Sequence, residues 1–150
     1  MPHFETERET FVAAAPAAVH ATLNDFRTWH TWSPWEELDP QLERTFSGAE
    51  TGVGSHYAWV GNKKVGEGSM EITGSTPERI DIDLEFLKPF KASNKTVFSL
   101  RPEGNGTRVV WAMSGERNLA FAVLGKLFFD NAIAKDFDKG LAKLKASLES

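Results

Sequence analysis

The sequence predicts an α+β protein in which an antiparallel sheet is covered by one long C-terminal helix. From about Leu42 to Ser114, apolar and polar residues alternate, and turn signals containing glycine or proline interrupt the alternation at short intervals. After about Asn118, the apolar residues recur at helical spacing instead. Because 150 residues can bury a core without disulfides, we expect one domain over residues 1–150.

The N-terminal segment predicts a strand followed by a helix. Residues 4–13 alternate in part, and Pro16 suits the first turn of a helix. One side of that helix carries apolar residues at spacings of four and three, namely Val19, Leu23 and Phe26. The helix leads into a polar connector that ends near Leu42, in which Pro34 and Pro40 forbid a long regular element.

The central segment predicts six strands joined by hairpins. In one of these strands, Ile80, Ile82 and Leu84 share a face with Phe86, while acidic residues occupy the other face. The same two-residue period pairs Tyr57 with Trp59, Met70 with Ile72, Phe98 with Leu100, and Trp111 with Val109 and Met113. Each strand therefore has one dry face, which predicts an antiparallel sheet with one buried side.

The C-terminal segment predicts an amphipathic helix that covers this sheet. Its apolar stripe consists of Ile133, Phe137, Leu141, Leu144 and Leu148. The part from Leu119 to Phe129 is apolar on nearly every side, which is more than one contact face requires. The surplus fits a cover over a cavity mouth or a contact with a neighbouring subunit, so a homodimer is one of the open alternatives.

Composition excludes several classes of function. A formal charge of -4 and a pI near 5.6, with scattered basic residues, offer no positive surface for nucleic acid. The absence of cysteine excludes disulfides and cysteine-ligated metals. Because the first residues do not resemble a signal peptide and no run of 18 apolar residues occurs, we expect a cytoplasmic protein without stable membrane insertion.

The usual motifs of metal, cofactor and nucleophile sites are missing from the sequence. His3, His20, His30 and His56 show no metal-ligand spacing, although ligands gathered only in space stay open. No Gly-x-Ser-x-Gly motif occurs, and Gly66 and Gly68 lack the third glycine of a dinucleotide fingerprint. We expect no metal and no cofactor, and we expect these two glycines to let the sheet bend or a large ring approach.

The predicted order of elements resembles the helix-grip fold of the START-like superfamily, and within it the polyketide cyclase/dehydrase-like (SRPBCC) branch. The local sequence carries the resemblance in a series of segments, among them Trp32-Ser33-Pro34-Trp35, Gly52-Val53-Gly54-Ser55, Tyr57-Ala58-Trp59-Val60-Gly61-Asn62, Gly66-Glu67-Gly68-Ser69-Met70-Glu71-Ile72 and Gly106-Thr107-Arg108-Val109-Val110-Trp111. The resemblance implies a curved sheet that holds a hydrophobic cavity against the last helix. The resemblance does not in itself imply an enzyme, because this branch has no family-wide catalytic motif that maps onto these residues.

Aromatic residues and methionines on the dry face are the candidate wall of that cavity. Three tryptophans, Trp29, Trp32 and Trp35, fall within seven residues of the connector, where they fit either a small core or a ligand-binding wall. The predicted ligand-binding residues are Trp32, Trp35, Tyr57, Trp59, Met70, Phe86, Phe98, Trp111 and Met113. Their sequence positions do not distinguish a cavity wall from core packing, and Trp111 is expected inside, under the C-terminal helix.

Three functions follow as hypotheses. The first is binding of a hydrophobic small molecule, for transport or sensing. The alternative is a cyclase or dehydratase that acts on a hydrophobic carbonyl compound, with His30, Glu36 or Tyr57 moving protons. A third reading, a partner-binding domain, would use the apolar surface between Leu119 and Phe129.

Overall fold

The computed structural model describes the backbone of residues 3–33, 41–61, 66–88, 92–116 and 128–149, and the side chains of residues 6–33, 41–61, 66–87, 93–115 and 135–149. In chain order the elements are β1 (His3–Val12), α1 (Pro16–Leu23), the 3-10 helix η1 (Phe26–Thr31), β2 (Glu43–Gly48), β3 (Ser55–Val60), β4 (Glu67–Thr76), β5 (Arg79–Lys88), β6 (Ala92–Glu103), β7 (Gly106–Glu116) and α3 (Phe128–Glu149). Trp35, Glu36 and the apolar segment 119–127 lie outside the described residues.

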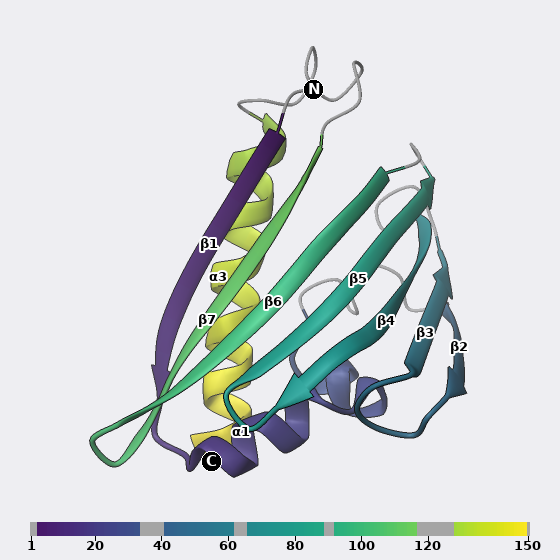
Figure 1. Ribbon diagram of the computed structural model, residues 1–150. Coiled ribbons are helices and arrows are strands. Elements are labelled where there is room, and N and C mark those ends of the chain that lie inside the picture. Colours follow the sequence, from purple (N-terminus) through teal and green to yellow (C-terminus); the bar gives the residue numbers. More distant parts are fainter. Residues whose placement is uncertain (1–2, 34–40, 62–65, 89–91, 117–127, 150) are drawn as a thin grey trace.

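The strands form one antiparallel sheet in the order β1-β7-β6-β5-β4-β3-β2. Figure 1 shows the sheet as a curved wall, with α3 running along one side of it and α1 and η1 at one end. The six strands predicted between Leu42 and Ser114 and the strand before them are confirmed. The pairing of β4 with β5 shifts register at Glu67/Gly68 and at Ile72/Gly74, and irregularities of this kind increase the local twist of a sheet.

The alternation along β5 explains why one face of the sheet is dry. Ile80, Ile82 and Leu84 are buried, whereas Asp81 and Asp83 between them are partly exposed. The same alternation buries Phe98 and Leu100 on β6, and Val109, Trp111 and Met113 on β7. Residues paired across antiparallel strands point to the same side, so these side chains form one continuous inner face.

Helix α3 covers this inner face with the predicted stripe. Phe137, Leu141 and Leu144 are buried, and Leu148 packs against the core cluster. The C-terminal end of α3 is tied to the end of β1: Lys145 Nζ donates to the carbonyl oxygen of Phe11 at 2.9 Å, and the backbone N–H of Ala13 donates to Glu149 Oε2 at 2.7 Å. Most of the apolar stripe is therefore fixed against the sheet.

The first helix is shorter than its apolar spacing predicts. Helix α1 ends at Leu23, and Phe26 opens the separate helix η1. The Asp25 side chain caps η1 by accepting a hydrogen bond from the N–H of Arg27 at 3.0 Å. Val19, Leu23 and Phe26 are all buried, so the predicted apolar side is correct although the helix is interrupted.

Candidate functional site

Residues that pair across neighbouring strands form rows on the inner face of the sheet. Strand pairing defines four successive rows, which we name by one member each. The Trp59 row contains Trp59, Gly68 and Phe86, and the next row, the Asn94 row, contains Tyr57, Met70, Leu84, Asn94 and Gly115. The Thr96 row follows and contains Ile72, Ile82, Thr96, Met113 and Thr6. The last of the four, the Phe98 row, contains Ile80, Phe98 and Trp111.

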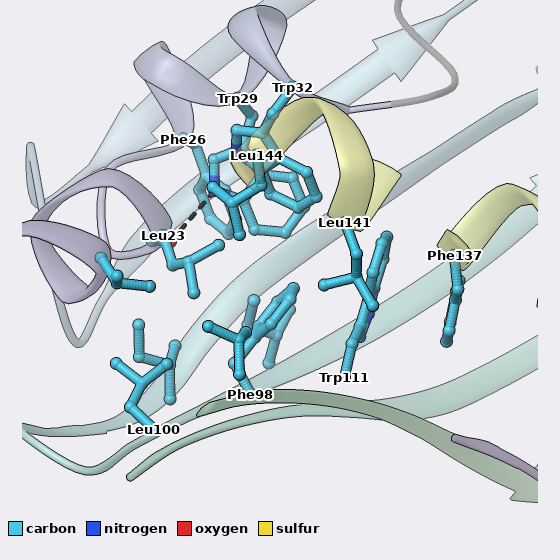
Figure 2. Packing of buried hydrophobic residues seen from close by; sticks show 14 of the residues in the cluster. Leu23, Phe26, Trp29, Trp32, Phe98, Leu100, Trp111, Phe137, Leu141 and Leu144 are labelled. Atoms are coloured by element: carbon cyan, nitrogen blue, oxygen red, sulfur yellow. Dashed lines mark hydrogen bonds between the residues drawn. The ribbon is translucent and has the colours of Figure 1, made fainter. Parts of the chain in front are cut away.

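One end of the inner face is filled by stacked aromatic rings, which we call the aromatic plug (Trp29, Trp32, Phe98, Trp111 and Phe137). The ring of Trp111 lies 3.9 Å from that of Phe137 with 7° between the planes, and 5.2 Å from that of Phe98. Trp32 meets the Trp111 ring edge-on at 5.4 Å. Figure 2 shows Phe98 and Trp111 rising from the sheet toward Leu141 and Phe137 of α3.

Three of the predicted ligand-binding residues belong to the aromatic plug. Trp32, Phe98 and Trp111 are almost completely buried and contact one another, which is the arrangement of a packed core. Trp29 adds a hydrogen bond from its Nε1 to the carbonyl oxygen of Leu23, at 3.0 Å. In this structure these rings fill space rather than line it.

Side chains at the other end of the inner face are less completely buried. Trp59, Met70 and Phe86 are partly buried and pack against the edge of the core. Trp59 lies 6.0 Å from Phe86, with the ring planes 83° apart. Phe46 on β2, paired with Tyr57, is 37% exposed. Burial thus decreases from the Phe98 row to the Trp59 row, and apolar side chains extend beyond the filled core.

Gly68 supplies the space that the Trp59 ring occupies. A Cβ at this position would lie 2.7 Å from Cη2 of Trp59 and would also collide with the carbonyl oxygen of Glu85. The expectation that this glycine admits a large ring is therefore confirmed, and its role is steric.

The inner face also carries polar residues that the sequence analysis did not single out. Asn94 and Thr96 are 5% and 4% exposed, and they share the face of Phe98 and Leu100 on β6. Among the described side chains, Asn94 Oδ1 and Trp32 Nε1 are buried without a hydrogen-bond partner. The period-two rule applied to Asn94-Lys95-Thr96-Val97-Phe98 would have found both residues, because it assigns them to the dry face.

Two of the three proposed catalytic residues lie in the described part of the chain, and one is exposed whereas the other is buried. His30 lies on the surface of η1, where its Nδ1–H donates to the carbonyl oxygen of Arg27 at 2.8 Å, so the expectation that it borders the aromatic set is wrong. Tyr57 is 4% exposed and lies in the Asn94 row between Phe26, Phe46 and Trp59. Glu36 lies outside the described residues. Tyr57 is thus the one member of this set with an observed place on the inner face.

A serine and a histidine do meet near α1, but their hydrogen bonds do not make a nucleophile. Ser75 Oγ donates to Asn24 Oδ1 at 2.7 Å, and His20 Nε2 lies 3.2 Å from the same Oγ. Because the hydroxyl proton is directed to Asn24, His20 serves as the donor to Ser75. An activated serine requires a base that accepts this proton instead.

The resolved pKa shifts occur at ion pairs on the surface. Hydrogen bonds to carboxylates raise the pKa of Arg79 (through Asp81), Lys95 (through Asp83) and Arg108 (through Glu103). The hydrogen bond from Arg108 lowers the pKa of Glu103, and the one from Lys145 lowers that of Glu149. In the described part of the chain, no group of three or more His, Asp or Glu side chains could hold a metal ion.

An open depression of about 590 Å³ crosses β5, β6 and β7. It is lined by Asp83, Leu84, Glu85, Ser93, Asn94, Lys95, Ser114 and Gly115. Three of these residues, Leu84, Asn94 and Gly115, belong to the Asn94 row. The other five alternate with these residues along the strands and face the outer side of the sheet, so most of the lining of the depression belongs to the outer face.

The sheet order and the covering helix define a helix-grip protein with an apolar inner face. The chain belongs to the family described as "Polyketide cyclase / dehydrase and lipid transport", whose sequence profile matches residues 2–149. A search of curated protein sequences found no significant match. Among the described helices, none is both long and apolar enough to cross a membrane.

Solved structures confirm the fold at low sequence identity. The Aha1 dimer from Colwellia psychrerythraea matches with a TM-score of 0.71 and 18% identity, covering 97% of this chain and 96% of that one. TTHA0849 from Thermus thermophilus matches with a TM-score of 0.68 and 18% identity, covering 97% of both chains. DynU16, from the dynemicin biosynthetic locus, matches with a TM-score of 0.66 and 14% identity, covering 97% of this chain and 47% of that one.

Proposed function

We propose that the protein binds a hydrophobic small molecule on the inner face of the sheet, between the sheet and the C-terminal helix. The observation that carries the proposal is the fall in burial from the aromatic plug to Trp59, Met70 and Phe86. Apolar side chains continue there beyond the region where the described residues fill the core. A ligand site of this kind needs a largely apolar wall with a few polar anchors.

The comparisons support the same class of function. The family description includes lipid transport, and the DynU16 relative belongs to a biosynthetic locus. Of the predicted ligand-binding residues, we assign Tyr57, Trp59, Met70, Phe86 and Met113 to the site. Trp32, Phe98 and Trp111 belong to the packed aromatic plug and are not assigned to the site, and Trp35 stays a prediction from the sequence.

Titration with N-phenyl-1-naphthylamine, an uncharged apolar fluorophore, tests this proposal. We expect saturable binding to the wild-type protein and weaker binding to Phe86→Ser, because the substitution removes an apolar ring from the wall. Val53→Ser is the matched control, since Val53 is an apolar residue that is 59% exposed and lies in the turn before β3. No uptake by the wild-type protein, or equal loss in both variants, would refute the assignment.

Proton-transfer chemistry is a second candidate function, favoured by one observation. The Tyr57 side chain is buried on the inner face in the same row as Met70, where its phenol could contact a bound carbonyl compound. Incubation of the wild-type protein with aromatic polyketide precursors should then yield cyclised or dehydrated product, and Tyr57→Phe should abolish the product while retaining fluorophore uptake. Turnover that survives in Tyr57→Phe would exclude Tyr57 as the proton donor.

We also propose that the protein forms a homodimer and is located in the cytoplasm. The dimer formed by the Aha1 relative supports a homodimer, and the cysteine-free sequence supports the cytoplasm. Light scattering coupled to size-exclusion chromatography would measure the mass directly. A monomeric mass at micromolar concentration would exclude the homodimer.

A further inference from the structure

The amide oxygen of Asn94 is a buried hydrogen-bond acceptor on the inner face of the sheet. This atom, Oδ1, has no hydrogen-bond partner among the described residues, and the residue as a whole is only 5% exposed. An unpaired buried amide oxygen costs about 1 to 3 kcal/mol, so native proteins rarely retain one without a reason. Asn94 stands in the row that continues through Leu84 to Met70, which places it beside the proposed apolar wall.

The neighbouring strand makes room for this amide. Gly115 pairs with Asn94 across β6 and β7, and a Cβ at position 115 would collide with Asn94 Oδ1. Glycine therefore leaves the space in which the carboxamide lies over the sheet. Two residues further along β6, on the same face, Thr96 adds a hydroxyl about 7 Å away on extended geometry.

The surroundings of Asn94 also indicate the charge of a ligand. The described members of the Asn94 row and the Thr96 row include no acidic or basic side chain. A charged group placed there would lose its hydration without an opposite charge to compensate, which is strongly unfavourable. A neutral group that donates a hydrogen bond would satisfy the amide oxygen at no such cost.

We propose that the ligand is an uncharged amphiphile, with an apolar body and a hydroxyl or N–H group that donates a hydrogen bond to Asn94 Oδ1. The proposal rests on the proposed binding function and specifies its ligand class. The apolar body lies against Met70, Leu84 and Phe86, while Asn94 and Thr96 select the polar group. Selection is effective because an analogue without the donor leaves the buried oxygen unpaired.

A matched pair of probes tests this selectivity. 2-Naphthol donates a hydrogen bond and 2-methoxynaphthalene does not, and each can be measured by displacement of N-phenyl-1-naphthylamine. We compare the ratio of their affinities between wild type and variants, so that the general difference in hydrophobicity between the probes cancels. We expect Asn94→Leu to reduce the preference for 2-naphthol by about fivefold, the value of one net hydrogen bond. The control Ser99→Ala alters an exposed residue on the outer face of β6 and should leave the ratio unchanged.

The outcomes separate this inference from the proposed function. If the wild-type protein binds the fluorophore but shows the same affinity ratio as Asn94→Leu, the role of Asn94 is refuted and the binding function stands. If the wild-type protein binds neither fluorophore nor probes, both proposals fall. Asn94→Ala provides a second variant should Asn94→Leu not fold, and thermal unfolding of each variant identifies which one to use.

Discussion

The ring of Trp111 on β7 lies flat against the ring of Phe137 on α3, with the centroids 3.9 Å apart and 7° between the planes. This contact joins the sheet to its covering helix at the centre of the aromatic plug. Phe98 and Trp32 contact the same indole from the neighbouring strand and from the end of η1. One residue therefore links three separate parts of the chain.

Trp111→Ala should lower the free energy of unfolding by about 3 to 5 kcal/mol, the usual loss when a large buried ring is deleted. The plug explains the size of the effect, because Trp111 is 2% exposed and contacts protein rings rather than open space. Chemical denaturation of both proteins measures the loss. A much smaller loss, together with a changed preference for ligand size, would show that the ring lines a cavity instead.

Asn94→Leu should leave the free energy of unfolding unchanged or raise it, because leucine removes a buried amide oxygen that has no hydrogen-bond partner. Thr107→Val is the contrasting variant. Thr107 is also buried, but its hydroxyl donates to the carbonyl oxygen of Ala14 at 2.8 Å. We expect Thr107→Val to lose about 1 kcal/mol. A larger loss from Asn94→Leu than from Thr107→Val would mean that the amide stabilises the ligand-free fold.

Gly115→Ala should lower the free energy of unfolding by about 1 to 3 kcal/mol, because the new methyl group collides with the Asn94 amide. Part of the loss should disappear when Asn94 is also replaced by alanine. Measuring both single variants and the double variant gives the coupling between the two positions. Additive losses would show that the collision falls on the backbone of Ser93, whose carbonyl oxygen would lie 3.1 Å from the new Cβ, rather than on Asn94.

Glu149→Gln should lower the melting temperature at pH 7, and the difference from wild type should vanish in acid. The hydrogen bond from Lys145 lowers the pKa of Glu149, helped by the one from the backbone of Ala13. A lowered pKa in the folded state means that the carboxylate stabilises the protein above its unfolded pKa, and that this contribution is lost as the pH falls through the folded value. Melting curves should therefore converge below about pH 4, given an ordinary glutamate pKa near 4.3. A constant difference across this range would contradict the assignment.

The sequence was sufficient to predict the fold because its main signal is local periodicity. Alternation over Ile80, Ile82 and Leu84 identified the dry face of β5, and the helical spacing of Phe137, Leu141 and Leu144 identified the face of α3. Neither inference requires knowledge of distant contacts. The break between α1 and η1 was missed because Phe26 continues the apolar spacing of Val19 and Leu23 across it.

The site was less predictable because it depends on how distant segments meet. Trp111 and Trp59 both lie on dry strand faces, yet one is stacked under α3 and the other remains partly exposed. His30 has an ordinary position in the sequence, and only the hydrogen bond to Arg27 within η1 shows that it faces away from the core. The alternation along β6 assigns Asn94 to the dry face, but a polar side chain is not expected there, so the residue was not singled out.

The aromatic plug also has a consequence for how this protein could diversify. The rings of the aromatic plug are almost completely buried at one end of the inner face, whereas Trp59, Met70 and Phe86 at the other end are only partly buried. Substitutions at these three positions remove fewer buried contacts than substitutions in the plug, so they should lower the free energy of unfolding less. Related chains can accordingly exchange these three residues while they keep the same fold.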